Sequence, residues 1–425
     1  MKEHRIGRRG FLRRTAAALG ALAVPHLVPT SALGADGESP PSDRITMGFI
    51  GVGGQGGGHL AGGAWTYLKG GYLGRPDVQV LAVCDLNPAR LKGAKATVEQ
   101  RYADRIKSGS YKGCADYRDF RELLARDDID AVLIATKPPN LHAIITIMAA
   151  KSGKDVYCEK PTAGTIRESR AMVAAIQRYG RVFQAGTQQR SEYEGRFHRA
   201  VELVRNGAIG ELKIVYTMTG GAGGLVNVHP LRPLPDGSDQ DLLGTATVRA
   251  PSGGYPNWEQ HHFDCAQWGV DGDRTGPVEI YREPNGPMVL RYASGVQVHC
   301  GAPNYSVPRF QGSVVYEGTQ GKIIVGREAL IADPPGILDT TIGPRGNRVY
   351  YSNSHSGNFL QCIRSRQLPI CDVETAHRSM SMILLAGMGH QLGRRLQWDP
   401  AREQFLGDDE ANRMLCAVAR PPWRI

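Results

Sequence analysis

A glycine-rich turn directly after a short apolar run is the feature that most limits what this chain can fold into. The run covers residues 45–50, and the turn G-V-G-G-Q-G follows it without a break. In a G-x-G-x-x-G turn between a strand and a helix, the first glycine permits the tight turn. The second lets the backbone approach a pyrophosphate, and the third allows close helix packing. We therefore predict that a dinucleotide is bound by Gly51, Gly53, Gly54, Gln55 and Gly56.

A second apolar run, residues 78–84, ends at Asp85. An acid at the tip of the second strand accepts hydrogen bonds from ribose hydroxyls and repels a 2′-phosphate, so Asp85 favours NAD over NADP. Further runs at 129–136 and 155–158, with a helix expected over 142–151, continue an alternation that specifies a doubly wound parallel sheet. Ligands bind beyond the carboxyl ends of such strands, where we expect the glycine turn, Asp85 and segment 136–139 to converge.

The sequence beyond residue 187 predicts a second domain that contains both strands and helices. Its short apolar runs have the spacing of an antiparallel sheet, and they cover 211–218, 287–292, 295–299, 313–317 and 321–325. Helices are expected over 358–366 and 375–392, and Trp398 is interpreted as the start of a polar tail. The predicted fold class is α/β: a Rossmann doubly wound parallel sheet over 44–187, plus a C-terminal α+β domain with a mostly antiparallel open sheet over 188–425.

The N-terminal segment is typical of a targeting signal. Residues 1–34 hold six Lys or Arg and one acid, which is half of the net charge of +10. R-R-G-F-L at 8–12 precedes an apolar stretch, 16–28, and small residues at 31–35, as in twin-arginine export signals. We expect export to the periplasm and a linker over 35–43. The apolar stretch is too short for stable membrane insertion. No later basic run with interleaved aromatic residues suggests nucleic-acid binding.

Eight cysteines are spread over the chain without Cys-x-x-Cys pairs or the spacing of a metal site. They are interpreted as mostly buried thiols, with room for one or two disulfides in an oxidising compartment. No metal is expected.

The fourth apolar run ends in Glu159-Lys160-Pro161. The glycine turn, the Ala-Thr-x-Pro segment at 135–138, this E-K-P and Q-A-G-T-Q-Q-R at 184–190 occur in an order that resembles the Gfo/Idh/MocA family, which includes glucose–fructose oxidoreductase and inositol dehydrogenase. The resemblance covers nearly all of the chain beyond the signal. It implies that Lys160 reaches the reacting carbon and that its bond to Pro161 is cis. Residues implied to contact the cofactor are Thr136, Pro138, His142, Glu159, Lys160 and Gln189, and Arg190 is implied to contact substrate.

The second motif of that family, roughly D-x-x-x-H-x-x-D on a helix, aligns with Asn257, His261 and Asp264. On a helix these three share a face, and His262 points elsewhere. His261 is the candidate proton acceptor because imidazole titrates near working pH. Asp264 and His262 are candidate substrate residues. Asn257 stands where an aspartate is expected and cannot hold negative charge against an imidazolium, which suggests a changed chemistry.

The resemblance implies an NAD-dependent oxidoreductase that acts on a sugar or polyol as a homo-oligomer, a dimer or tetramer. Hydride transfer from an alcohol needs a proton acceptor and a cation beside the developing alkoxide, which are the roles of His261 and Lys160. Outside the cytoplasm there is no nicotinamide pool, so we expect a tightly held cofactor that is restored in the same site. Paired oxidation and reduction of two substrates meets this condition, and so does redox-neutral cleavage of a glycoside. A non-enzymatic nucleotide-bound sensor is the third reading.

Overall fold

The structure is a computed structural model that describes residues 43–63, 67–136, 141–218, 259–308 and 313–416. Residues Met1–Arg44 separate from a single compact unit that covers Ile45–Ile425. The expected signal at 1–34, Pro138 and Asn257 lie outside the described residues.

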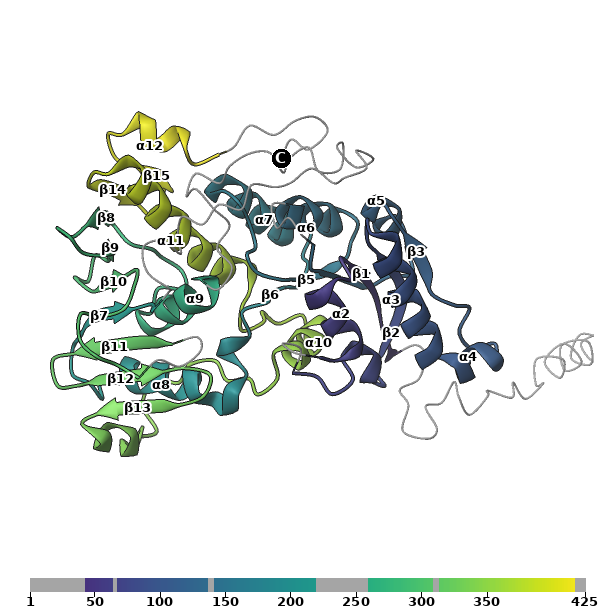
Figure 1. The fold of residues 1–425 in the computed structure, drawn as a ribbon, viewed down its shortest axis with the longest axis horizontal. Coiled ribbons are helices and arrows are strands. Elements are labelled where there is room, and N and C mark those ends of the chain that lie inside the picture. Colours follow the sequence, from purple (N-terminus) through teal and green to yellow (C-terminus); the bar gives the residue numbers. More distant parts are fainter. Residues whose placement is uncertain (1–42, 64–66, 137–140, 219–258, 309–312, 417–425) are drawn as a thin grey trace, which may run out of the picture. The chain divides into compact units, whose positions relative to one another are not determined.

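Six parallel strands form the first sheet, in the order β3-β2-β1-β4-β5-β6 (Figure 1). They are β1 (Ile45–Ile50), β2 (Val78–Cys84), β3 (Ala115–Tyr117), β4 (Ala131–Ile134), β5 (Asp155–Cys158) and β6 (Phe183–Ala185). The apolar runs of β4 and β5 are buried along their whole length because helices cover both faces of a parallel sheet. The predicted parallel sheet is confirmed. The sequence reading missed β3, a short strand at the sheet edge whose residues are at least partly exposed.

Helices flank this sheet on both faces (Figure 1). One face carries α5 (Phe120–Leu124), α6 (Leu141–Lys151) and α7 (Ile166–Arg178). The other carries α2 (Gly54–Ala61), α3 (Pro88–Arg101) and α10 (His355–Ser365), and α4 (Ala103–Lys107) follows α3. The position of α10 is unexpected, since Phe359, Leu360 and Cys362 complete a core cluster otherwise built before residue 183. A helix from the chain beyond residue 187 therefore shares a core with the parallel sheet.

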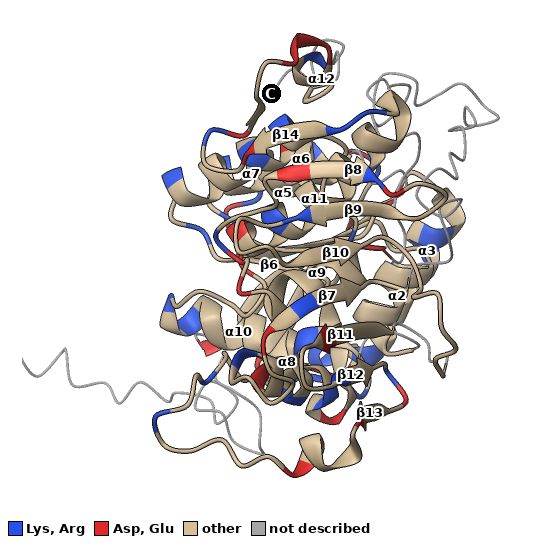
Figure 2. Ribbon diagram, turned by 90° about the vertical axis from the view of Figure 1, so that its left-hand side faces the viewer, with Lys and Arg blue, Asp and Glu red and all other residues tan. Residues whose placement is uncertain are grey.

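Nine strands form the second sheet, which Figure 2 shows face on with both signs of charge scattered over its strands. Its order is β13-β12-β11-β7-β10-β9-β8-β14-β15, and only β7 and β10 pair in parallel. The bounds are β7 (Leu212–Tyr216), β8 (Glu279–Arg282), β9 (Met288–Arg291), β10 (Gln297–His299), β11 (Val314–Gly318), β12 (Lys322–Val325), β13 (Leu330–Asp333), β14 (Leu396–Asp399) and β15 (Gln404–Phe405).

The mostly antiparallel second sheet is confirmed, but the interpretation of Trp398 as the start of a polar tail is wrong. Trp398 lies in β14, where its ring packs against Phe405 of β15 with the ring centroids 4.9 Å apart. A final helix, α12 (Asp409–Arg413), follows. The tail reading failed because β14 alternates buried and more exposed residues, so its polar side chains look like those of a tail.

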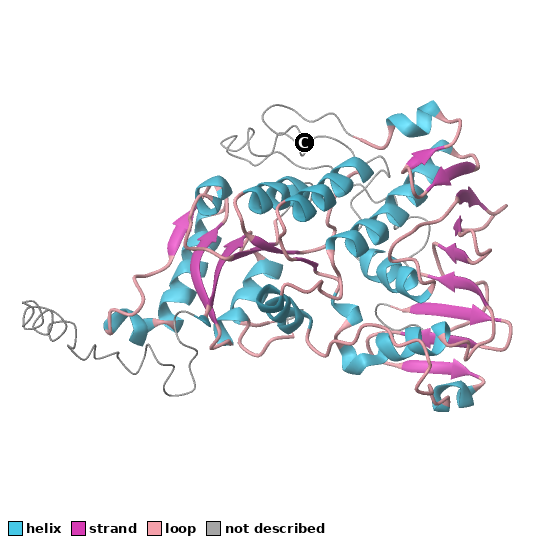
Figure 3. Ribbon diagram, turned by 180° about the vertical axis from the view of Figure 1, so that it is seen from behind, coloured by secondary structure: helices cyan, strands magenta, loops and turns pink. Residues whose placement is uncertain are grey.

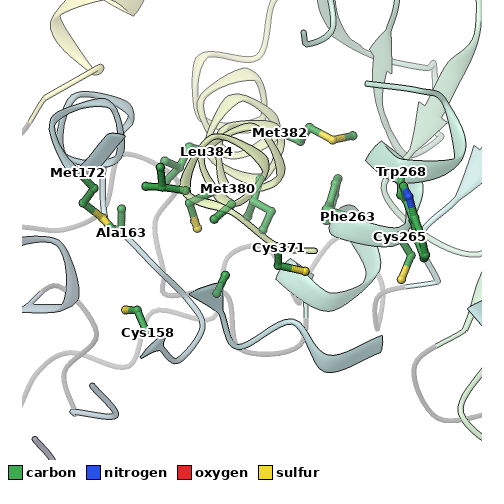
Figure 4. Close-up of a cluster of buried hydrophobic side chains, with 14 of the residues drawn as sticks. Cys158, Ala163, Met172, Phe263, Cys265, Trp268, Cys371, Met380, Met382 and Leu384 are labelled. Carbon is green, nitrogen blue, oxygen red and sulfur yellow. The ribbon is translucent and has the colours of Figure 1, made fainter. Parts of the chain in front are cut away.

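Three helices connect the sheets: α8 (Arg196–Arg205), α9 (Glu259–Gly269) and α11 (Val373–Leu392) (Figure 3). Every residue of α9 is buried. Helix α11 starts at an Asp372 cap, whose carboxylate accepts hydrogen bonds from the amides of Glu374 and Thr375. Figure 4 shows one continuous core running from Met172 of α7 through Met380 of α11 to Phe263 of α9. This shared core fixes α9 relative to the parallel sheet.

All eight cysteines are free thiols, and only Cys416 is exposed. The structure therefore uses neither of the disulfides for which the sequence left room. Within the described ranges, no helix combines the length and the apolar character needed to cross a membrane. No cluster of His, Cys, Asp or Glu in the same ranges has the arrangement of a metal site.

Candidate active site

The glycine turn after β1 has two glycines that the fold itself requires. Gly51 has φ of 85°, and a Cβ there would lie 2.6 Å from the Ala135 carbonyl oxygen. A Cβ on Gly56 would lie 1.8 Å from the Gly51 carbonyl oxygen, so nothing larger fits where α2 leaves the turn. Gly53 differs, because a Cβ there would meet only the flexible Arg90 guanidinium, at 3.3 Å, and one on Gly54 would meet nothing within 4 Å. The turn therefore keeps open space above its backbone at the start of a helix.

The carboxyl ends of β1, β2 and β4 meet at this turn. The Asp85 carboxylate accepts hydrogen bonds from the amides of Val52 and Asn87, both at 2.9 Å. Thr136 lies beside Gly51, and its buried hydroxyl has no hydrogen-bond partner among the described residues. The strand order reverses between β1 and β4, which is where doubly wound sheets bind ligands. An open turn at a helix N-terminus, a strand-end acid and an unpartnered hydroxyl fit a dinucleotide.

The E-K-P turn follows β5, and the Lys160–Pro161 bond is cis, as the resemblance implies. Lys160 is partly buried. His142, predicted to contact the cofactor, is buried between two backbone carbonyls: Nδ1 is 2.9 Å from the Pro161 oxygen and Nε2 is 3.2 Å from the Thr136 oxygen. Burial lowers the pKa of His142. The imidazole thus lies between the ends of β4 and β5, and because a neutral ring carries one N–H, it donates to only one of the two carbonyls at a time.

Glu159, another residue predicted to contact the cofactor, is 2% exposed, and its carboxylate makes internal hydrogen bonds. Its carboxylate accepts hydrogen bonds from His59 Nε2 and Gln188 Nε2, both at 2.8 Å, and from the amide of Lys160 at 3.3 Å. Burial alone would raise the pKa of Glu159, but the His59 hydrogen bond and the neighbouring charges outweigh it and leave the pKa below its usual value.

His261 and His262 are consecutive residues of α9, and both side chains are buried. Burial lowers the pKa of His261 well below its usual value, and the charges of Lys160 and Arg327 lower it further. His262 donates from Nδ1 to the Thr217 carbonyl at 2.5 Å, and its buried Nε2 has no partner among the described residues. Burial lowers the pKa of His262 to about 4. Both imidazoles are therefore neutral at neutral pH.

Arg190 and Asp264, predicted as substrate residues, instead pair with each other. The Asp264 carboxylate accepts two hydrogen bonds from the Arg190 guanidinium, at 2.7 and 2.9 Å, and Asp273 accepts two more at 2.7 and 2.8 Å. Arg190 lies over the Trp268 ring, 4.9 Å from its centroid, and is 1% exposed. The pair ties the short helix η5 (Gln188–Arg190) to α9 and leaves no free charge for a substrate.

Arg327, after β12, is a residue that the sequence reading missed. Its Nε donates to Gln189 Oε1 at 3.3 Å, and Gln189 in turn donates to the Cys265 sulfur of α9 at 3.4 Å. The guanidinium stacks on the Tyr193 ring, 4.9 Å from the centroid. No local pattern marks Arg327, because only the folding of the second sheet brings its turn to α9. His59 was missed too, although its place three residues after Gly56 puts it on the same face of α2 as that glycine.

The chain belongs to the Gfo/Idh/MocA oxidoreductase family. Residues 45–187 match the family described as "Oxidoreductase family, NAD-binding Rossmann fold", and residues 249–425 match "Oxidoreductase family, C-terminal alpha/beta domain". The N-terminal part is therefore a nicotinamide dinucleotide-binding domain of this family.

Three similar proteins illustrate the range of the family. An "Uncharacterized oxidoreductase" of Streptococcus pneumoniae is 32% identical over 36% of this chain and 36% of its own length. A "Glycosyl hydrolase family 109 protein" of Shewanella sp. is 29% identical over 49% of this chain and 45% of its own. The chain thus spans less than half of these relatives. The solved aldose–aldose oxidoreductase of Caulobacter crescentus shares the fold, with a TM-score of 0.57 and 21% identity over 83% of this chain and 99% of that one.

Proposed function

We propose that the protein oxidises a hydroxyl group of a sugar or polyol by hydride transfer and retains its nicotinamide cofactor between turnovers. The observation that carries this proposal is that the turn holding Lys160 and the helix holding His261 are hydrogen-bonded to each other. The Thr162 amide donates to Gln260 Oε1 at 3.0 Å, and Gln260 Nε2 donates to the Thr162 hydroxyl at 3.2 Å. A cation and a neutral imidazole beside one dinucleotide turn are the groups that alcohol oxidation needs.

Each residue has a distinct part. The bound nicotinamide supplies a hydride acceptor. The ammonium of Lys160 stabilises the negative charge that develops on the substrate oxygen, and His261 accepts the hydroxyl proton. Burial lowers the pKa of His261, which keeps its imidazole unprotonated at neutral pH but also makes it a weaker base than an imidazole that titrates near working pH. Gly53 and Gly54 leave room for the diphosphate beside the first amides of α2.

We assign NAD rather than NADP as the cofactor on the basis of Asp85. Its carboxylate uses two of about four acceptor sites on the amides of Val52 and Asn87, which leaves the others for ribose hydroxyls. Its negative charge opposes a 2′-phosphate. Calorimetric titration with NAD+ and NADP+, on protein first freed of its bound nucleotide, tests the assignment: NAD+ should bind more tightly than NADP+, and Asp85→Asn should reduce the difference between the two affinities.

Redox-neutral glycoside cleavage is the second candidate, and the relatives named glycosyl hydrolase family 109 favour it. Oxidation at C3 acidifies the C2 proton, so a weak base suffices to remove it. Loss of the substituent at C1, addition of water and return of the hydride to C3 then leave a free sugar and no net change in the cofactor. The same Lys160 and His261 would serve this sequence.

The decisive experiment has two stages. Denaturation of the purified protein, followed by mass spectrometry, should release stoichiometric NAD(H). Incubation with D-glucose, D-xylose, myo-inositol and p-nitrophenyl glycosides then separates the candidates. Paired ketone or lactone and alcohol products indicate the oxidoreductase, whereas free sugar without NADH indicates the glycosidase. Unaltered nucleotide binding by a Lys160→Ala, His261→Ala variant, with no turnover by it or by the parent, would leave only the sensor.

Export and assembly are separate parts of the proposal. We propose periplasmic export by the Arg8-Arg9 signal, tested by fusing residues 1–43 to a reporter and replacing both arginines with Lys. We propose a homo-oligomer that forms through the second sheet, as the family resemblance implies. Light scattering of the purified protein measures the oligomeric state.

A further inference from the structure

Beneath the E-K-P turn lies a buried polar cluster that the proposed chemistry does not use. Its centre is the pair His59–Glu159, whose side chains are 0% and 3% exposed and whose Nε2 and Oε1 atoms are 2.8 Å apart. Gln188 Nε2 donates to Glu159 at 2.8 Å and to the Tyr157 hydroxyl at 3.0 Å. The members come from α2, β5 and η5, which are far apart in the sequence.

These contacts join the parts of the molecule that the proposed reaction must align. His59 lies on α2, whose first turn begins the dinucleotide site. Glu159 immediately precedes Lys160 and accepts a hydrogen bond from its amide. Gln188 begins η5, which the Arg190–Asp264 pair fastens to α9. One carboxylate therefore connects the phosphate-binding helix, the lysine turn and the support of the histidine helix.

Stability alone does not account for this buried polar cluster. His59 Nδ1 is buried without a hydrogen-bond partner among the described residues, which is a cost to folding. Burying a charged carboxylate is also costly, and apolar residues of similar volume often give equal or greater stability. The backbone makes room for it as well: a Cβ on Gly186 would lie 2.5 Å from Glu159 Oε1. A costly polar contact at a junction is typical of a group that fixes relative position.

We propose that His59 is a positioning residue which, through Glu159, holds the Lys160 turn in register with helix α2 for hydride transfer. This inference rests on the proposed function. The essential interaction is the hydrogen bond that the His59 Nε2–H donates to the carboxylate.

Two substitutions of His59 separate position from packing. His59→Gln keeps an N–H donor near the place of Nε2, whereas His59→Leu keeps the bulk and removes the donor. Turnover is measured with the best substrate of the sugar and glycoside panel, and binding is measured with NAD+ by calorimetry. Because small displacements of reacting groups are costly, His59→Leu should lower kcat roughly tenfold to a hundredfold. NAD+ affinity should change far less, and His59→Gln should restore most of kcat.

The chain supplies a matched control in a second buried His–Glu pair. His377 Nε2 lies 2.6 Å from Glu403 Oε1, and no hydrogen-bond partner of His377 belongs to the proposed site. His377→Leu should lower thermal stability and leave kcat per folded molecule unchanged. A double-mutant cycle of His59→Leu with Glu159→Gln should be strongly non-additive, since the two residues act through one contact.

A second readout does not depend on turnover. The rate at which trinitrobenzenesulfonate labels Lys160, followed by peptide mass spectrometry in the protein without substrate, should rise in His59→Leu and stay near the parent value in His59→Gln and His377→Leu. Unchanged kcat and labelling in His59→Leu, or additive effects of the two substitutions, would overturn the inference while Lys160→Ala still abolished turnover. Full turnover by Lys160→Ala would overturn the proposed function and this inference together.

Discussion

Gly53 and Gly56 lie in the same turn but are glycines for different reasons. At Gly56 the protein's own backbone excludes a side chain, since a Cβ would lie 1.8 Å from the Gly51 oxygen. At Gly53 the neighbours would tolerate one, so the need for glycine comes from whatever occupies the space above the turn.

Replacing Gly53 or Gly56 with Ala should therefore have different effects on NAD+ affinity and thermal stability. Gly53→Ala should keep the parent melting temperature and lose affinity for NAD+, because within the protein the new methyl group meets only the flexible Arg90 side chain, which can move, whereas the bound diphosphate cannot. Gly56→Ala should lower the melting temperature as well, because the turn must open. Thermal unfolding and calorimetric titration of both variants make the comparison. Full NAD+ affinity in Gly53→Ala would place the diphosphate elsewhere.

The Arg190 pairing makes a second prediction at this scale. Arg190→Met leaves Asp264 buried without its partner, and loss of one member of a buried pair costs about 3–5 kcal/mol in the free energy of unfolding. Lys95→Ala removes a solvent-exposed partner of Asp116 and should change that free energy little. Denaturant unfolding of both variants measures the difference. Equal stabilities would show that the Arg190 network is not what holds η5 to α9.

Sequence alone predicts the candidate site residues that lie in local motifs. The glycine turn, Asp85, Lys160 and the buried α9 histidines are marked by spacing. The pairing of Arg190 with Asp264, the internal bonds of Glu159 and the position of Arg327 depend on packing between distant segments. Both misassigned roles and missed residues therefore concern the same kind of contact, in which a charge finds its partner only after the chain has folded.

At the scale of elements, the unusual member is α10. It belongs to the chain beyond residue 187 but shares a core cluster with residues of β1, β2 and α3. Phe359, which like Leu360 is fully buried, packs against the Tyr157 ring of β5 with the ring centroids 5.7 Å apart. Arg366, at its C-terminus, also donates to the Asp155 carboxylate of β5 at 2.6 and 3.0 Å. Strand periodicity predicted both sheets well, but it carries no information about which sheet a distant helix will cover.

A fragment of residues 44–187 should consequently not unfold cooperatively, because its sheet lacks the cover of α10. In the whole chain, Phe359→Ala should lower the free energy of unfolding by about 3–5 kcal/mol through the cavity it leaves. Leu368, which is 65% exposed, provides the control, and its replacement by Ala should have little effect. Thermal unfolding followed by circular dichroism measures the cooperativity of the fragment and the stability of the two variants. A sharp transition in the fragment would contradict this role of α10.

For the molecule as a whole, buried imidazoles dominate the response to acid. The pKa is lowered, chiefly by burial, at His142, His198, His261, His262, His299, His355 and His377. The pKa is about 4 for both His262 and His355. In the unfolded chain these histidines bind protons near pH 6.5, whereas in the folded protein they stay neutral until the pH is lower. The free energy of unfolding that they contribute above pH 6.5 is therefore lost as the pH falls towards 4.

Between pH 7 and pH 5, His262 and His355 should each lower the free energy of unfolding by about 2 kcal/mol. Glu192 acts in the opposite sense, because burial raises its pKa to about 7 and it binds a proton in the folded state first. Its protonation should offset about as much free energy of unfolding as one of these histidines removes. Guanidinium titrations should show lower stability at pH 5, with a steeper loss in Glu192→Gln. A flat profile would mean that the imidazoles become solvated.

The late position of α10 in the chain also sets a timetable for biosynthesis. The nucleotide-binding sheet is complete in sequence by residue 185, but the face that carries α2 and α3 lacks its third helix, α10, until residues 355–365 leave the ribosome. At about 5–20 residues per second, that interval lasts roughly ten to forty seconds. During it the nascent chain exposes the apolar surface that Phe359 and Leu360 will cover, and this is the period in which we expect chaperone binding.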